Sequence, residues 1–243
     1  MTQIFQDTAS LKEIEEIGKY GIASGVTTNQ KIFLEKAKGC NFEKQAKKII
    51  EMLYPLPVSL EGPNNLEDLV KTAVQYHIWG CLETPTYSNV VIKVPMMGNG
   101  DGLKAVKILS ANGIKTNVTA CMTLNQTFLA ANAGATYVSL FYNRIKDWLK
   151  ETMKCNESFA IITASNVIRE TMNMLEKGNY ATQLIVGSIR KPTDVEDIIL
   201  ANPDIITIPT KILKQMPYND MTEKTLKEFD KAWIDFCKTE KKC

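Results

Sequence analysis

A single lysine stands in the middle of an otherwise apolar run. The run is Asn89-Val90-Val91-Ile92-Lys93-Val94-Pro95, and its length and β-branched residues predict a fully buried strand. Burial disfavours the charged ammonium and lowers its pKa, so a neutral amine becomes available near neutral pH to attack a carbonyl carbon. The alternative is a lysine near a strand end whose ammonium reaches back to water. The pattern makes Lys93 a candidate Schiff-base residue.

Polar and ionisable residues also follow the other apolar runs. They stand where the expected strands end: Asp7, Thr28 with Asn29, Glu61, Lys93, Asn117 with Thr119, Ser139 followed by Arg144, and Ser188 with Arg190. Taken singly, each has an ordinary structural role, such as capping a helix, holding a turn or carrying a solvated charge. Their shared position favours one site where the loops after parallel strands converge.

Strand and helix patterns alternate along the whole chain. Buried strands are expected at Gln3 to Asp7, Gly25 to Asn29, Pro57 to Glu61, Val90 to Val94, Lys115 to Thr119, Thr136 to Phe141, Gln183 to Gly187 and Ile205 to Ile208. Helices are expected at Leu11 to Tyr20, Phe42 to Leu53, Leu66 to Tyr76, Gly102 to Ala111, Leu124 to Ala131, Phe159 to Leu175, Thr193 to Leu200 and Leu226 to Phe236. Apolar residues at three- and four-residue spacing support these helices.

Local signals agree with this alternation. Ser10 with Glu13 and Thr193 with Glu196 fit capping boxes, and the glycines expected to end helices are Gly113, Gly134 and Gly178. A chain of 243 residues suits one barrel of about 250 residues. We therefore predict an α/β fold: a single (β/α)8 TIM barrel over residues 1–243, with 222–243 as a C-terminal helical extension. A doubly wound open sheet is the alternative, although no dinucleotide-binding glycine pattern follows the first strand.

Composition limits the possible partners. The formal net charge is +2, so the chain has no overall electrostatic footprint for nucleic acid or an anionic membrane. No apolar run approaches the roughly 18 residues that span a bilayer, and no early apolar stretch follows a basic start. We expect a cytoplasmic protein without nucleic-acid or membrane partners.

Cysteine and histidine usage argues against a metal centre. The six cysteines are irregularly spaced and form no CxxC pair, and His77 is the single histidine. Neither a disulfide framework nor a zinc site is expected from this pattern. We interpret Cys243 as an exposed terminal thiol and His77 as structural.

Five motifs resemble those of the small transaldolases and the related fructose-6-phosphate aldolases. They occur in the family's order and cover nearly the whole chain: Val26-Thr27-Thr28-Asn29, Val91-Ile92-Lys93-Val94-Pro95, Asn117-Val118-Thr119, Asn143-Arg144-Ile145 and Gly187-Ser188-Ile189-Arg190. The resemblance implies a barrel of the class I aldolase type, with the Schiff-base lysine on the fourth strand and no metal or organic cofactor.

Two positions separate the branches of that family. Glu61 ends the third expected strand, as in transaldolases, whereas the aldolase branch tends to carry glutamine; Phe141 stands where the aldolase branch has tyrosine. The resemblance therefore implies a transaldolase of the pentose phosphate pathway, moving a dihydroxyacetone unit from fructose 6-phosphate or sedoheptulose 7-phosphate to an aldose phosphate. The alternatives are an aldolase-type enzyme releasing free dihydroxyacetone and glyceraldehyde 3-phosphate, and a non-catalytic sugar-phosphate-binding barrel.

The resemblance also implies residue roles. Lys93 would attack the C2 carbonyl, Asp7 would accept the C4 hydroxyl proton, and Glu61 with Thr119 would hold the catalytic water. The residues implied to bind substrate are Thr28, Asn29, Asn117, Ser139 and Phe141, with Arg144, Ser188 and Arg190 on the phosphate.

The chain departs from the family pattern in places. Gln30-Lys31 replaces a proline-serine pair, and Leu140 stands where proline is usual. The segment from Gly80 to Ser88 is also longer than in typical members. These changes leave the Schiff-base residues in place and bear on the choice of donor and acceptor.

The C-terminal stretch carries apolar residues at helical spacing, namely Leu226, Phe229, Trp233 and Phe236. This is more apolar surface than an isolated helix leaves in water. Such a helix can cover its own barrel; the resemblance instead implies a ring-shaped oligomer in which it reaches a neighbour. We expect a homo-oligomer, a pentamer or decamer.

Overall fold

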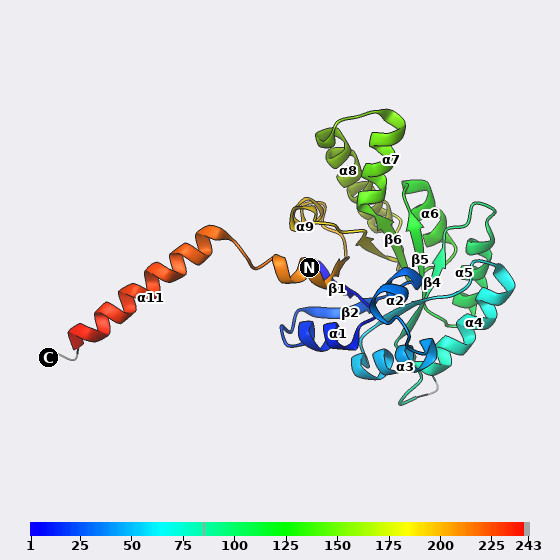
Figure 1. Ribbon diagram of the computed structural model, residues 1–243. Coiled ribbons are helices and arrows are strands. Elements are labelled where there is room, and N and C mark those ends of the chain that lie inside the picture. Colours follow the sequence, from blue (N-terminus) through cyan, green and yellow to red (C-terminus); the bar gives the residue numbers. More distant parts are fainter. Residues whose placement is uncertain (85, 241–243) are drawn as a thin grey trace.

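In residues 1–84 and 86–240, which the computed structural model describes, eight parallel strands form a closed barrel (Figure 1). Each strand pairs with the next, and the last pairs with the first. This order confirms the predicted barrel and excludes the open sheet. The strands are β1 (Gln3–Asp7), β2 (Ala23–Thr27), β3 (Val58–Glu61), β4 (Val90–Pro95), β5 (Thr116–Cys121), β6 (Tyr137–Phe141), β7 (Gln183–Gly187) and β8 (Ile205–Pro209).

Most helices connect the strands and cover the outside of the barrel, whereas α10 (Thr210–Gln215) and α11 (Asp220–Glu240) follow the last strand (Figure 1). The others are α1 (Leu11–Gly18), α2 (Gln30–Lys36), α3 (Phe42–Leu53), α4 (Leu66–Trp79), α5 (Asp101–Ala111), α6 (Leu124–Asn132), α7 (Tyr142–Met153), α8 (Glu157–Lys177) and α9 (Pro192–Ile199). The sequence patterns do not predict α2, α7 and α10.

In β4, the alternation of side chains between the two faces of the strand determines the direction of Lys93. Val90, Ile92 and Val94 belong to the large apolar core of buried residues. Because successive side chains of a strand point to opposite faces, Val91 and Lys93 point to the other face, into the barrel. The sequence thus places an amine inside the barrel, on a strand whose other side chains are apolar and, except for Pro95, buried.

A second apolar cluster lies inside the barrel, closer to the amino ends of the strands than the polar residues. It consists of Phe5, Ile185 and Ile205, with Tyr137 packed against it. Gly25 makes room for this packing, because a Cβ at this position would lie 2.8 Å from the Phe5 ring and 2.9 Å from the Pro57 carbonyl oxygen. The cluster closes the barrel beneath the polar residues and leaves them open at the carboxyl ends of the strands.

The expected helix signals are only partly correct. The expected box of Ser10 with Glu13 is half formed. Ser10 is the N-cap of α1 and accepts a hydrogen bond from the Glu13 backbone N–H, but the Ser10 N–H donates to the Thr8 hydroxyl, which itself donates to the Glu13 carboxylate. The expected capping box of Thr193 with Glu196 is wrong, because Pro192 already occupies the first turn of α9 and Asp194 accepts from the Lys191 backbone N–H at the helix start. A proline fits this first turn because its missing N–H has no helical partner there.

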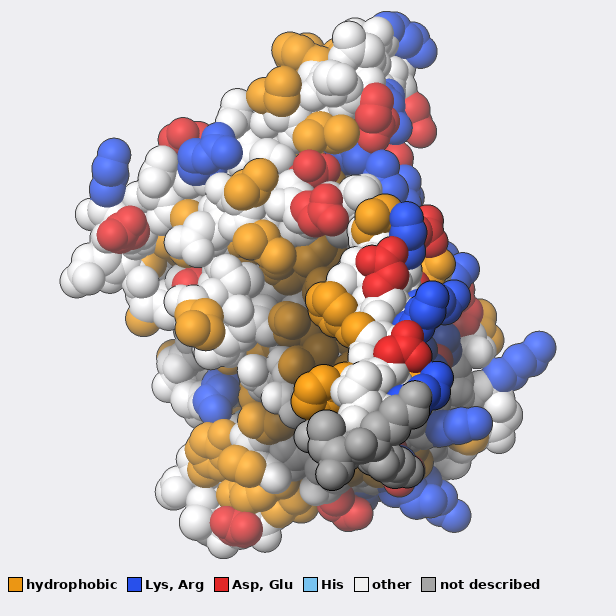
Figure 2. Space-filling model, turned by 90° about the vertical axis from the view of Figure 1, so that its left-hand side faces the viewer, with side chains coloured by type: hydrophobic (Ala, Val, Ile, Leu, Met, Phe, Trp, Pro, Cys, Tyr) orange, Lys and Arg blue, Asp and Glu red, His pale blue; other side chains and the backbone are white. Residues whose placement is uncertain are grey.

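The C-terminal helix α11 extends away from the barrel (Figure 1). Leu226, Phe229, Trp233 and Phe236 are each at least half exposed, and hydrophobic side chains gather along one side of this helix (Figure 2). The interpretation that it covers its own barrel is therefore wrong for this structure. The helix begins at Asp220 rather than at 222, and residues 241–243 of the expected extension, including Cys243, lie outside the described residues, as does Pro85.

Among the residues that the structure describes, no helix combines the length and the apolar character needed to cross a membrane.

Candidate active site

Lys93 lies inside the barrel, near the carboxyl ends of the strands. It is 5% exposed, and its strand pairs it in register with Glu61 of β3 and Asn117 of β5. Burial lowers the pKa of the Lys93 ammonium, although the carboxylates of Asp7 and Glu61 act in the opposite direction. The predicted nucleophilic amine therefore has the environment that the sequence pattern indicates.

Two hollows open beside Lys93, and both are lined by Asn29, Lys93 and Phe141. The first, of about 270 Å³, is further lined by Gln30, Lys31, Glu61, Pro95, Thr119 and Ala120. The second, of about 150 Å³, is further lined by Asp7, Ser139, Arg144, Gly187, Ser188 and Thr207. The first holds a carboxylate, and the second holds a carboxylate and a guanidinium. A small polar molecule that reaches the amine can thus contact both sides.

The two carboxylates next to the amine are partly buried. Burial raises the pKa of Asp7, while attraction to Lys93 and a hydrogen bond from the Thr27 hydroxyl at 2.7 Å oppose this effect. Burial likewise raises the pKa of Glu61, against the attraction of Lys93. Raised carboxyl pKa values and a lowered ammonium pKa bring the three groups closer together in proton affinity, as proton transfer near neutral pH requires.

A layer of hydroxyl and amide groups lies among the inward-pointing side chains of the barrel. The Ser139 hydroxyl donates to Asn117 Oδ1 at 2.7 Å, and Asn117 Nδ2 donates to the Ser59 hydroxyl at 3.4 Å. On the strands that flank β1, the Thr27 and Thr207 hydroxyls bond to each other. These bonds hold the polar side chains in fixed positions, so the groups above them are supported by a rigid scaffold.

The basic residues lie at the ends of β6 and β7. Arg144, in the first turn of α7, lines the smaller hollow together with Ser188. Ser188 has φ +64°, a left-handed conformation that is uncommon for a residue with a side chain. Arg190 points its guanidinium at Asp147, with Nη1 donating to Oδ1 at 2.9 Å and Nη2 bonded to Oδ2.

Nine of the predicted site residues line one or both hollows. They are Asp7, Asn29, Glu61, Lys93, Thr119, Ser139, Phe141, Arg144 and Ser188. The other three lie elsewhere: Thr28 is buried with its hydroxyl on the Ser59 carbonyl oxygen, Asn117 belongs to the polar layer, and Arg190 pairs with Asp147.

The sequence patterns missed some contributors to the site. Thr27 and Thr207 read as ordinary β-branched strand residues. Pairing of β1 with β2 brings the Thr27 hydroxyl to Asp7, and pairing of β1 with β8 brings Thr207 to the same hollow. Ala120 lines the larger hollow with φ +60°, a conformation that no sequence signal at an alanine indicates.

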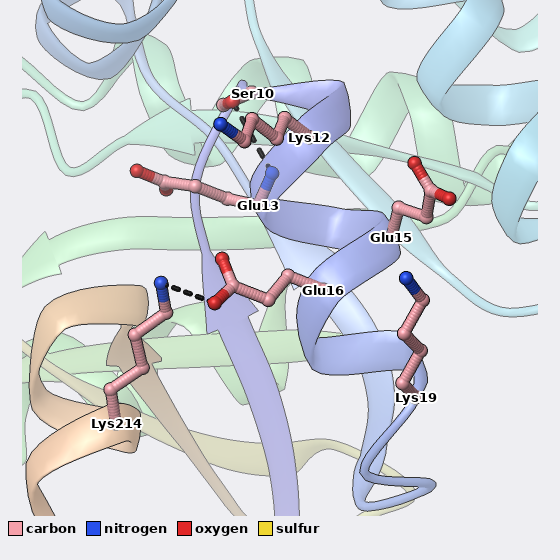
Figure 3. A pocket seen from close by; sticks show the side chains of 7 residues that line it. All are labelled: Ser10, Lys12, Glu13, Glu15, Glu16, Lys19 and Lys214. Atoms are coloured by element: carbon pink, nitrogen blue, oxygen red, sulfur yellow. Dashed lines mark hydrogen bonds and ion pairs between the residues drawn. The ribbon is translucent and has the colours of Figure 1, made fainter.

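Two larger hollows on the surface are not lined by Lys93, although one of them shares Arg144 with the smaller hollow. One, of about 550 Å³, lies next to α1 and α10 (Figure 3), where Lys214 pairs with Glu16 at 2.5 Å. Its lining residues are Ser10, Lys12, Glu13, Glu15, Glu16, Lys19 and Lys214. The other, of about 670 Å³, is a mostly apolar groove that includes Leu124, Ile145 and Trp148. Neither contains Lys93, so we assign the chemistry to the hollows beside that residue. Among the described residues, no three His, Cys, Asp or Glu side chains are grouped to hold a metal ion.

Comparison with known proteins agrees with this geometry. Residues 4–242 match the family described as Transaldolase/Fructose-6-phosphate aldolase. A protein named "Probable transaldolase" from Moorella thermoacetica is 36% identical over 231 residues, which cover 95% of this chain and 97% of that protein. Proteins of the same name from Bartonella henselae and Lactiplantibacillus plantarum are 34% and 33% identical, over 95% and 98% of this chain and 96% and 100% of their own lengths.

Proposed function

Because the protein is an enzyme that belongs to the transaldolase/fructose-6-phosphate aldolase family, we propose that it transfers a dihydroxyacetone unit from a ketose phosphate to an aldose phosphate. The proposed donors are fructose 6-phosphate and sedoheptulose 7-phosphate. The observation that carries this proposal is the position of Lys93, a buried amine of lowered pKa that opens to two hollows and has a carboxylate on each side.

The first proposed step forms a Schiff base. The neutral Lys93 amine adds to the C2 carbonyl carbon, and the resulting carbinolamine loses its hydroxyl as water to give an iminium. Because burial raises the pKa of Glu61, its carboxyl group keeps a proton to higher pH than an exposed glutamate does, and it can pass this proton to the departing hydroxyl through a water shared with Thr119.

The second proposed step breaks the C3–C4 bond. Asp7 accepts the proton of the C4 hydroxyl, the C3–C4 electron pair moves into the iminium, and the aldose phosphate leaves. The raised pKa of Asp7 makes it a stronger base than an exposed aspartate, and the Thr27 hydroxyl holds the carboxylate in place. The enamine left on Lys93 then attacks the aldehyde of the second aldose phosphate, with each proton transfer reversed.

Substrate binding is proposed to use both hollows. Asn29, Asn117 and Ser139 would hydrogen-bond the dihydroxyacetone unit, with Phe141 packed against it and Thr28 supporting the strand end. The phosphate would lie on the side of Arg144, Ser188 and Arg190, because guanidinium groups bind phosphate through charge-assisted hydrogen bonds. We propose that this activity belongs to the pentose phosphate pathway and takes place in the cytoplasm.

We further propose that the chain acts as a homo-oligomer, a pentamer or decamer, with residues 1–243 as one barrel domain and 222–243 as its extension. The support is the exposed apolar side of α11, which carries Phe229 and Trp233 at 64% and 65% exposure. Large apolar side chains in such a row are stabilised when a second protein surface covers them.

Borohydride reduction with fructose 6-phosphate tests the proposed activity, because it converts a Schiff base on Lys93 into a stable adduct that mass spectrometry can locate. Turnover that requires erythrose 4-phosphate supports transfer. Turnover without an acceptor, with release of free dihydroxyacetone, would identify an aldolase instead, and an enzyme that forms no adduct would contradict the proposal.

A further inference from the structure

Asp194 is a fully buried carboxylate outside both hollows. It is 0% exposed and lies in the first turn of α9, just after the loop that follows β7. A buried carboxylate is costly unless several donors compensate its charge. The hydrogen-bond donors around Asp194 therefore show which segments of the chain it connects.

One oxygen of Asp194 accepts three hydrogen bonds. Oδ2 accepts from the backbone N–H groups of Arg190 at 2.9 Å and Lys191 at 3.1 Å, and from Asn143 Nδ2 at 2.7 Å. The bond from Lys191 is an ordinary feature of a helix start. The bonds from Arg190 and Asn143 are additional to it. The first fixes the backbone before α9, and the second connects that backbone to α7.

Asn143 extends this connection to the rim of the site. Its Nδ2 also donates to the Ser188 carbonyl oxygen at 2.8 Å, and its side chain is buried. Asn143 directly precedes Arg144, while Ser188 lies in the strained left-handed conformation at φ +64°. Such a conformation persists only where surrounding bonds hold it. Asn143 and Asp194 supply these bonds.

The second oxygen of Asp194 faces a buried cation. Asp194 Oδ1 lies 3.6 Å from Lys146 Nζ, which also pairs with Glu157 at 2.9 Å and lies 5.1 Å from the Tyr142 ring centroid. Lys146 is 2% exposed. This ion pair compensates the charge of Asp194 through Oδ1, whereas the loop backbone is bonded to Oδ2, so Lys146 provides an internal comparison.

We propose that Asp194, acting through Asn143 and the loop backbone, is a positioning residue that holds Ser188 and Arg190 against the helix that carries Arg144, and so sets the affinity for the substrate phosphate. The inference rests on the proposed function, because it presumes a phosphorylated substrate. Asp194 lines neither hollow. It would therefore affect substrate binding and not the chemistry at Lys93.

The test compares Asp194→Asn and Asn143→Ala with the wild type. We expect both variants to raise the KM for fructose 6-phosphate and the inhibition constant of inorganic phosphate, by about tenfold for Asp194→Asn, because hydrogen bonds to a buried charge are among the stronger ones. kcat should change by less than about threefold, and borohydride trapping with unphosphorylated dihydroxyacetone should be unchanged, since neither residue lines the hollows. The double variant should resemble the more affected single variant, as expected for residues that act as one unit.

Lys146→Met is the matched control. It removes a member of the same buried cluster but leaves the three bonds to Asp194 Oδ2 in place. It should lower the melting temperature and leave the KM for fructose 6-phosphate within about twofold of wild type, because the lost ion pair is made to Oδ1 and the loop backbone is bonded to Oδ2. An equal rise in KM for Lys146→Met would show that the KM reports general destabilisation.

Folded Asn143→Ala and Asp194→Asn proteins with wild-type KM and phosphate inhibition would overturn the inference, as would parallel loss of trapping with dihydroxyacetone. If Asp194→Asn fails to fold, Asn143→Ala decides alone, because it leaves no unpaired charge. A wild-type enzyme that is trapped with neither substrate would instead mean that the proposed function fails. In that case calorimetric binding of inorganic phosphate to wild type and Asn143→Ala still tests the loop directly.

Discussion

Glu61 and Lys93 occupy paired positions where β3 and β4 lie side by side. Both side chains point into the barrel, and both line the larger hollow. Burial raises the pKa of Glu61 and lowers that of Lys93. The pair therefore places a carboxyl group that can hold a proton next to an amine that can lose one, which is the combination needed to dehydrate a carbinolamine.

Glu61→Gln should shift the fate of the Lys93-bound intermediate. A glutamine cannot exchange protons with the neighbouring water, so overall turnover should fall, and free dihydroxyacetone should form a larger share of the product. The ratio of transfer to cleavage with fructose 6-phosphate, measured with and without erythrose 4-phosphate, reports this change. An unchanged ratio would show that Glu61 does not direct the outcome.

Phe141→Tyr should act in the same direction without the loss in rate. Phe141 lines both hollows beside Lys93, and the added hydroxyl would provide a proton donor near the water. We expect increased release of free dihydroxyacetone in the same assay. Phe141→Leu, which adds no hydroxyl, is the control and should leave the product ratio unaltered.

Arg144→Ala should weaken binding of phosphorylated substrates more than Arg190→Ala does. Arg144 lines the smaller hollow, whereas Arg190 already bonds Asp147 through both terminal nitrogens. Loss of a charge-assisted contact from an exposed arginine should raise the KM for fructose 6-phosphate roughly tenfold. A larger KM effect for Arg190→Ala would mean that Arg190 leaves Asp147 to bind the phosphate.

The buried amine should also be visible in the pH dependence of stability. Burial lowers the pKa of Lys93, so between that value and about 10.4, the pKa of a lysine in an unfolded chain, the unfolded state binds one more proton than the folded state. The free energy of unfolding of the wild type therefore rises with pH in this window. Urea denaturation should show Lys93→Met as the more stable protein at neutral pH, with the difference shrinking toward pH 10. A difference independent of pH would contradict a destabilised ammonium.

The apolar side of α11 should control assembly. Replacing Phe229 and Trp233 by glutamate introduces charge into the row of exposed apolar residues and should yield a monomer of 27.2 kDa by light scattering. Glu228→Lys, on the same helix but outside that row, should retain the wild-type oligomer. A wild type that is already monomeric at micromolar concentration would rule out the proposed oligomer.

The sequence predicts the barrel well because each strand carries its own apolar signal. It also singles out Lys93 as a buried lysine inside the barrel, since a lysine inside such a run has few structural explanations; its role as the nucleophile stays a prediction. The helix α7 has no such signal, because it starts at Tyr142, directly after the last residue of β6, without a side-chain cap to mark the start. The contacts of Thr27 with Asp7 and of Asn143 with Asp194 join residues far apart in the chain. They depend on which strands lie side by side, β1 beside β2 and β6 beside β7, and have no local signature.

The most direct test of the central claim is borohydride trapping of Lys93→Met with fructose 6-phosphate, followed by peptide mass spectrometry. Methionine fills a similar apolar volume without an amine, so the variant should remain folded. We expect a dihydroxyacetone-derived adduct on Lys93 in the wild type, and neither an adduct nor transfer in the variant. Near-normal transfer by folded Lys93→Met, or a wild-type adduct located on a different lysine, would contradict the account.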